Sequence, residues 1–199
     1  MKNFVIGTLG GGIIIFFWSA ISWMILPIHS NTYKYHSHQE ELMVQLEKFQ
    51  TEDGVYVLPT ADDRKISRSS EAYQNAEVLL KQASLNKPWM ILIYLNHKES
   101  MTFITLAKGF LYDLFIAFAF CFALSRIGPG VSYASRFMVC LIIGMAFIFQ
   151  GPLRYVNWQG YPLSFFIGEI IDTLVEVALV GGFISWIFGP DCNKMECLS

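Results

Sequence analysis

The stretch FVIGTLGGGIIIFFWSAISWMIL, which runs from Phe4 to Leu26, decides the class of fold. It holds 23 residues without a charge, and a helix needs about 20 apolar residues to cross a bilayer. Lys2 precedes it, as a basic residue precedes the core of a signal peptide, but the run is long for one and has no small-x-small cleavage site. We therefore expect residues 1–26 to form a retained N-terminal transmembrane anchor.

Three more apolar runs follow the anchor. They are Phe103–Leu124, Phe137–Phe149, which reaches span length if it continues to Tyr155, and Leu163–Phe188. A Gly-Pro-Gly turn separates the first two, and a segment rich in Tyr, Trp, Asn and Gln, around 152–162, indicates an interfacial turn before the last. The pattern predicts a mainly α membrane protein with four transmembrane helices. Residues 103–188 then form a three-helix transmembrane region, and residues 189–199 form a tail.

Residues 27–102 differ sharply from the apolar runs, because they hold 18 of the 30 charged residues. Ser37-x-x-Glu40 is a capping-box pattern at the start of a helix, and a second helix is expected from about Ser70 to Ala83. The runs 54–59 and 88–95 predict strands. These elements predict a small α/β extramembrane insert between helices 1 and 2. An insert of this size buries little core by itself, so we expect it to lean on the helices or on a partner.

Composition argues against several classes of function. The net charge of -2, without a basic cluster, argues against a nucleic-acid-binding protein. Cys192-x4-Cys197 is one pair of ligands, short of the four that a structural zinc site needs. The sequence shows no nucleophile elbow and no Cys/His pair in one compartment, the patterns that would indicate an active site. We expect a protein that is not an enzyme and needs no cofactor.

Lysine and arginine in the short loops predict the orientation. With the N-terminus inside, the inner side holds four basic residues and the short outer loop holds Arg154 alone. The inner residues are Lys2, Arg126, Arg136 and Lys194. Both termini are therefore expected in the cytoplasm, with the 27–102 insert and its polar helices extracytoplasmic.

The most informative feature for function is polar chemistry inside the apolar runs. Glu169, Asp172 and Glu176 are spaced i, i+3, i+7 and so form one acidic stripe on the last helix. With residues from the other spans they make a candidate intramembrane polar cluster. Its members are Lys108, Asp113, Arg154, Glu169, Asp172 and Glu176. Lys108, Arg154 and Glu169 fall in the outer third, where ion pairs between spans could form. The two basic residues can pair with only two of the four acids. The other two carboxyl groups must then be protonated, hydrated or bound to a cation.

Three interpretations of this cluster stay open. Buried ion pairs and protonated carboxyls can join helices that have no hydrophobic reason to associate. Ionisable groups at membrane depth can also form an ion, proton or small polar-ligand site. A third reading is a contact site for another membrane subunit.

All four histidines lie in or beside the polar insert. His36-x-His38, with His29 just past the first span, is a weak candidate for a metal site, because a third or fourth ligand is not evident. We expect solvated histidines rather than a bound metal.

The stretch FWSAISWMILPIH from Phe17 to His29, the segment GVYVLP from Gly54 to Pro59, and the acidic last span resemble a family of small, uncharacterised, four-span bacterial inner-membrane proteins. The resemblance runs over most of the chain and implies a multi-pass protein of the bacterial inner membrane. It implies no activity and no site residue.

The preferred hypothesis is a non-enzymatic membrane component or accessory subunit, in contact with a partner membrane protein or with copies of itself. The alternative is a small oligomeric transporter or ion/proton-binding protein that uses the acidic stripe of the last helix. An intramembrane lipid-modifying enzyme built on Asp172 and Glu176 is a third hypothesis without evidence of its own.

Overall fold

The computed structural model describes residues 2–49, 52–61, 66–98, 100–128 and 130–189. Most of the tail expected at 189–199, with Cys192, Lys194 and Cys197, lies outside these residues. The chain divides into two compact units, a helical unit of residues 1–35 and 101–199 and an insert unit of residues 36–100. Residues 27–35 and 101–102, expected to belong to the insert, are therefore part of the helical unit.

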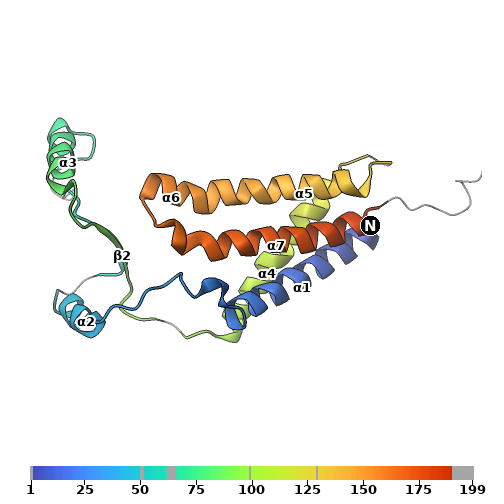
Figure 1. Cartoon of the computed structure of the whole chain (residues 1–199), viewed down its shortest axis with the longest axis horizontal. Coiled ribbons are helices and arrows are strands. Elements are labelled where there is room, and N and C mark those ends of the chain that lie inside the picture. The colour runs from blue at the N-terminus through green and yellow to red at the C-terminus, as the bar shows by residue number, and fades with distance from the viewer. Residues whose placement is uncertain (1, 50–51, 62–65, 99, 129, 190–199) are drawn as a thin grey trace, which may run out of the picture. The chain divides into compact units, whose positions relative to one another are not determined.

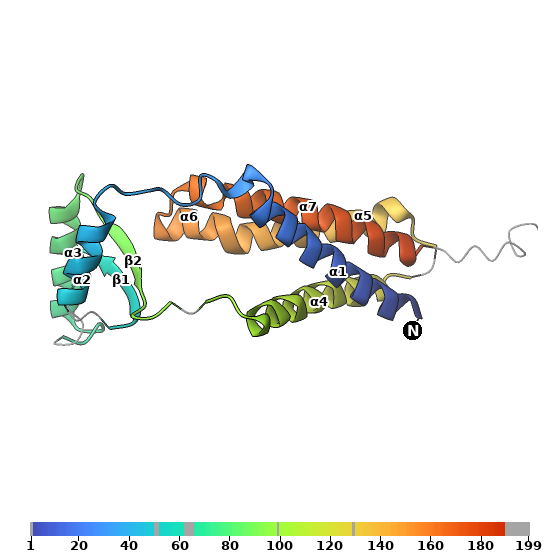
Figure 2. The same cartoon turned by 90° about the horizontal axis from the view of Figure 1, so that it is seen from below.

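The helical unit contains four helices long and apolar enough to cross a membrane. They are α1 (Lys2–Met24), α4 (Phe103–Ser125), α5 (Tyr133–Ile148), which continues without a break to Gln159, and α7 (Leu163–Ile187). Helix α1 packs against both α4 and α7, and α5 packs mainly against α7 (Figure 1). Figure 2 shows α1 running beside α4 on one side and α7 on the other. The four runs expected from hydropathy are thus confirmed as helices.

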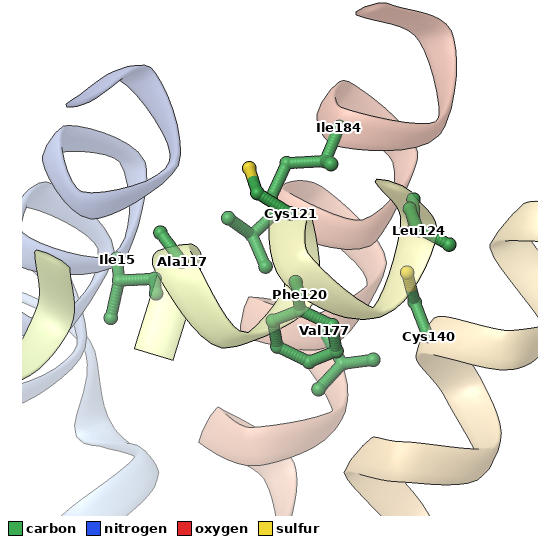
Figure 3. Packing of buried hydrophobic residues seen from close by; sticks show 9 residues of the cluster. Ile15, Ala117, Phe120, Cys121, Leu124, Cys140, Val177 and Ile184 are labelled. Carbon is green, nitrogen blue, oxygen red and sulfur yellow. The ribbon is translucent and has the colours of Figure 1, made fainter. Parts of the chain in front are cut away.

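The core of the helical unit lies where all four long helices meet. Its buried residues are Ile15, Ala117, Phe120, Cys121, Leu124, Cys140, Val177, Val180 and Ile184. In Figure 3, Phe120 lies beside Val177, and Cys121 lies beside Ile184. Most of the remaining apolar side chains of these helices are exposed, as expected for surfaces that face lipid rather than water.

Glycines bring α1 close to its neighbours. Gly7 and Gly11, four residues apart, are both buried on one face of α1. A Cβ atom at Gly11 would lie 2.8 Å from the Cβ of Ala117 on α4 and 2.9 Å from a methyl group of Val180 on α7. Small residues at this spacing allow helix backbones to approach closely in membranes. The approach of α1 to two helices at once therefore depends on the missing side chain.

The expectation of a turn from Pro152 to Pro162 is wrong for most of its length. Helix α5 passes through a π-helical turn, η2 (Phe149–Leu153), into α6 (Arg154–Gln159), so the third candidate span is 27 residues long. Pro152 lies inside the π turn. Proline has no N–H for the helical ladder, and a π bulge accommodates it without ending the helix. The chain turns only at Gly160, which adopts the left-handed conformation.

The insert unit consists of helices α2 (Gln39–Lys48) and α3 (Glu71–Ser84) and strands β1 (Gly54–Leu58) and β2 (Met90–Tyr94). The strands form an antiparallel pair in which Val55 faces Ile93 and Val57 faces Ile91. The expected order of helix, strand, helix, strand is confirmed. Ser70 caps α3 by accepting a hydrogen bond from the N–H of Tyr73.

One expectation for the insert is wrong in detail. The capping box at Ser37 does not form, because α2 begins one residue later, behind His38, which makes no side-chain cap. The run 88–95 contains the strand β2, and within the insert unit neither Met90 nor Ile93 is buried, since both are more than half exposed.

Candidate functional site

A short series of polar contacts joins α1 to α7 inside the helical unit. It comprises Ser19, Ser22, His29, Asp172 and Glu176, and is called the polar ladder below. The serines lie three residues apart on α1 and the acids four residues apart on α7, so each pair occupies one face of its helix. Two rungs of contact result, one at Ser22 and Asp172 and one at Ser19 and Glu176.

The chain brings His29 back to the helices that it has just left. Helix α1 ends at Met24, and Pro27 starts the single 3-10 turn η1 (Pro27–His29), which contacts both α1 and α7. The preset φ of proline suits the first position of such a turn. The imidazole then lies against Gly168 of α7, where a Cβ atom would be 2.5 Å from His29 Nδ1. Only a residue without a side chain leaves room for the ring there.

In the first rung, the side chains of His29 and Asp172 are buried and lie at the distance of a hydrogen-bonded ion pair. His29 Nε2 lies 2.8 Å from Asp172 Oδ2, and the two side chains are only 7% and 9% exposed. Ser22 Oγ donates to Asp172 Oδ1 at 2.5 Å. The Trp23 ring stacks on the imidazole with centroids 3.8 Å apart and planes 12° apart. Asp172 thus receives partners on both oxygens, as a carboxylate removed from water requires.

The trio of Ser22, His29 and Asp172 has the residue types of a hydrolase triad but not its geometry. In a triad one ring nitrogen contacts the serine and the other contacts the acid. Here Nε2 is close to both, at 3.2 Å from Ser22 Oγ and 2.8 Å from Asp172. The serine proton points to the acid, and His29 Nδ1 has no hydrogen-bond partner in the described residues. The imidazole is therefore not placed to activate Ser22 as a nucleophile.

The second rung lies one helical turn further along α7. Ser19 Oγ donates to Glu176 Oε1 at 3.1 Å. The carboxyls of Asp172, Asp113 and Glu169 are close enough to act electrostatically on Glu176. The helical unit therefore gathers four acids from two helices in one region. In the described residues, His29 is the one basic side chain that pairs with any of them.

A cavity of about 140 Å³ lies beside the second rung. Glu176 and Thr173 line it together with apolar residues of α1, α4, α5 and α7, namely Ile15, Ile116, Phe120, Phe147, Val177 and Val180. At about 30 Å³ for each molecule of liquid water, roughly five waters would fill this volume. A carboxyl that faces such a space can meet water or a small cation without leaving the helices.

The structure separates the members of the sequence-predicted cluster. Asp113, Glu169 and Asp172 each lie close enough to Glu176 to act on its charge, and Asp172 and Glu176 contact α1. Lys108 and Arg154 are exposed, and in the part of the chain that the structure describes neither forms an ion pair with these acids. The ion pairs between spans that the sequence allowed among Lys108, Arg154 and Glu169 are therefore not found in the described residues.

Sequence reasoning missed His29 as a partner of Asp172. It grouped His29 with His36 and His38 as a weak metal candidate, whereas His29 Nε2 contacts Asp172. His38 Nδ1 lies 3.4 Å from Glu41, and the N–H of His38 bonds to His36 Nδ1. Within the described ranges, no three His, Cys, Asp or Glu side chains converge as metal ligands. The excess of acids over cations in the spans was the signal that one more basic partner was needed.

A second candidate site lies in the insert unit. Val55, Val57, Ile91 and Ile93 share one face of the β1–β2 ribbon, here called the aliphatic face. Val55 and Ile93 are 67% and 65% exposed. A separate groove of about 610 Å³ lies between the end of β1 and α3, and Trp89, Leu85 and Val57 are among its lining residues. The insert unit therefore leaves much of its apolar surface uncovered.

Comparison with known proteins finds no relative: no family model, no curated protein and no solved structure matches the chain significantly.

Proposed function

We propose that this chain is a multi-pass membrane protein and a non-enzymatic component that binds a protein partner through its insert unit. Four helices of sufficient length and hydropathy support the membrane assignment. The balance of lysine and arginine in the short loops supports cytoplasmic termini and an extracytoplasmic insert. The resemblance noted above favours a bacterial inner membrane.

The observation that carries the proposal is the uncovered aliphatic face. Burying one Val or Ile side chain contributes about 1.5–3 kcal/mol relative to leaving it in water. An isolated two-stranded ribbon is marginally stable at best. In the insert unit, Tyr73 and Tyr94 are the hydrophobic residues that count as buried among those described. A second surface that covers Val55 and Ile93 would therefore stabilise both the ribbon and the complex.

The groove beside α3 extends the surface offered to a partner. Trp89 and Leu85, which line it, are half exposed or more. Exposed aromatic side chains often dominate protein interfaces, because they bury a large area with few rotatable bonds. A partner segment with apolar side chains fits this chemistry.

The test is to express the tagged full chain, extract it in a mild detergent and record native mass spectra of wild type and variants. Ile93→Thr and Val55→Thr should abolish a stoichiometric complex while the protein still accumulates. Val78→Thr on α3 is the matched control, since Val78 is 52% exposed but lies off the ribbon. An undiminished complex in Ile93→Thr and Val55→Thr would contradict the proposal.

A second candidate function is proton or small-cation binding at Glu176. The cavity beside this carboxyl and the three neighbouring acids favour it, because a water-accessible acid group at membrane depth can exchange protons or hold a cation. In vesicles containing purified protein, Glu176→Gln should lose proton or sodium uptake yet retain wild-type thermal stability. If Glu176→Gln instead fails to accumulate, or retains uptake, the carboxyl has a structural role.

A further inference from the structure

A polar pocket lies on the last turns of the third candidate span. It has a volume of about 380 Å³ and is lined by Gln150, Arg154, Tyr155, Trp158 and Gln159. These residues follow two rows in which neighbours are four positions apart, so they share one side of η2 and α6. The helix reaches these positions because the π turn η2 carries α5 past its proline.

Every side chain of this pocket has a hydrogen-bond donor, and none is acidic. Arg154 carries the positive charge, the two glutamines carry amide N–H groups, and Tyr155 and Trp158 carry an O–H and an N–H. Within the described ranges, none of these donors is engaged by another group of the chain, and Arg154 forms no ion pair. A lining of unused donors around one cation is complementary to an anion.

The length of the span places this pocket at the level of the lipid headgroups. The helix Tyr133–Gln159 has 27 residues, or about 40 Å at about 1.5 Å each, whereas the hydrocarbon core of a bilayer is about 30 Å thick. Helix α6 lies at the opposite end of the helical unit from the N-terminus (Figure 1), which is the outer side in the proposed orientation. Tyrosine and tryptophan are typical of this level. The anion that a bilayer presents there is the phosphate of its phospholipids.

We propose that this pocket binds the phosphodiester of an anionic phospholipid, with Arg154 holding the charge. The proposal rests on the membrane assignment proposed above but not on the partner of the insert unit. The planar guanidinium donates two N–H groups to two phosphate oxygens at once. A zwitterionic lipid brings an additional ammonium group, and the lining has no carboxylate to pair with it. Trp158 is 79% exposed, so the chain itself leaves its ring for a lipid to cover.

The test measures lipid retention by native mass spectrometry of the full chain in a mild detergent. Phosphatidylglycerol and phosphatidylcholine with the same acyl chains are added separately in equal amounts. Wild type should retain the first phosphatidylglycerol about tenfold better, the effect expected for one hydrogen bond between charged groups. Arg154→Gln should lose this preference. Its melting temperature without added lipid should equal that of wild type, because Arg154 is exposed.

Arg126→Gln is the matched control. Arg126 is also an exposed arginine at the end of a long helix, but it lies outside the pocket, with its guanidinium 4.7 Å from the centre of the Phe122 ring. This variant should keep the wild-type preference. Gln150→Ala should weaken the preference several-fold, and it provides a second variant of the pocket if Arg154→Gln fails to accumulate.

Equal retention of both lipids by wild type, or an equal loss in Arg154→Gln and Arg126→Gln, would overturn the proposal. Inorganic phosphate distinguishes the other source of the same anion. If phosphate alone raises the melting temperature of wild type as much as phosphatidylglycerol does, and not that of Arg154→Gln, the pocket takes a free phosphate and not a lipid. Failure of the membrane assignment itself would instead appear as protein that stays soluble without detergent.

Discussion

At the scale of single residues, Asp172 shows how an acid is accommodated among apolar helices. Its two oxygens meet Ser22 Oγ and His29 Nε2, and Trp23 covers the imidazole. Each contact lowers the cost of holding the carboxyl away from water. Gly168 provides the space for the ring. The rung joins the end of α1 to the first half of α7, so its loss should loosen both.

Ser22→Ala removes one of the two donors to Asp172. We expect a loss of about 1–3 kcal/mol in the free energy of unfolding, because a buried oxygen of Asp172 is left without a partner. Thermal unfolding in detergent, followed by size-exclusion chromatography, measures the change. Ser125→Ala is the control, since Ser125 is exposed and bonds to its own helix at Phe122 O. Equal stability of the two variants would argue that the rung contributes nothing.

Asp172→Asn tests the other half of the rung. The side chain keeps its size but loses its charge, so His29 has no carboxylate to pair with. Breaking a buried pair by removing one partner costs about 3–5 kcal/mol. We expect a much lower melting temperature, and His29→Gln should add little to the loss in the double variant. Additive losses would show that the two side chains act independently.

At the scale of elements, α1 packs more extensively than α5 against α4, also contacts α7, and its glycines make this packing close. Gly11→Ala would place a methyl group 2.8 Å from Ala117 Cβ, which cannot turn away as a long side chain can. Overpacking of this kind costs about 1–3 kcal/mol. We expect a corresponding fall in the melting temperature of Gly11→Ala in detergent.

Gly109→Ala on α4 is the control for this prediction. Nothing lies within 4 Å of a Cβ atom at Gly109, so the substitution should leave the melting temperature unchanged or raise it slightly. A similar loss in both variants would show that glycine matters for a reason other than helix approach.

At the scale of the whole molecule, the proposed orientation places residues 36–100 outside the cytoplasm. Trypsin added to spheroplasts should therefore cut at the basic residues of the insert unit, such as Arg68 and Lys81, and leave the chain uncut at Arg126, on the cytoplasmic side. In inverted membrane vesicles the same sites should be protected. The reverse pattern would require the opposite orientation, and with it a cytoplasmic partner for the aliphatic face.

The sequence by itself determined the features that depend on neighbouring residues. Hydropathy adds up over a window of about 20 residues, so the four long helices follow from local composition alone. The order of elements in the insert and the single face of Glu169, Asp172 and Glu176 follow from helix and strand periodicity. Sequence rules for helix ends failed at two places where the backbone has more than one favourable conformation. One is the cap of α2, and the other is Pro152, which a π turn accommodates.

Only the tertiary structure decided which polar groups meet. His29 and Asp172 are 143 residues apart in the chain, and no periodicity connects them. Lys108 and Arg154 have the right charge to pair with the acids, but their positions on the helices leave them exposed. Whether a segment forms a span depends on the summed transfer free energies of neighbouring residues. A hydrogen-bonded pair of side chains instead needs two particular atoms within about 3 Å of each other. That distance is set by how α1, η1 and α7 pack, which no single segment encodes.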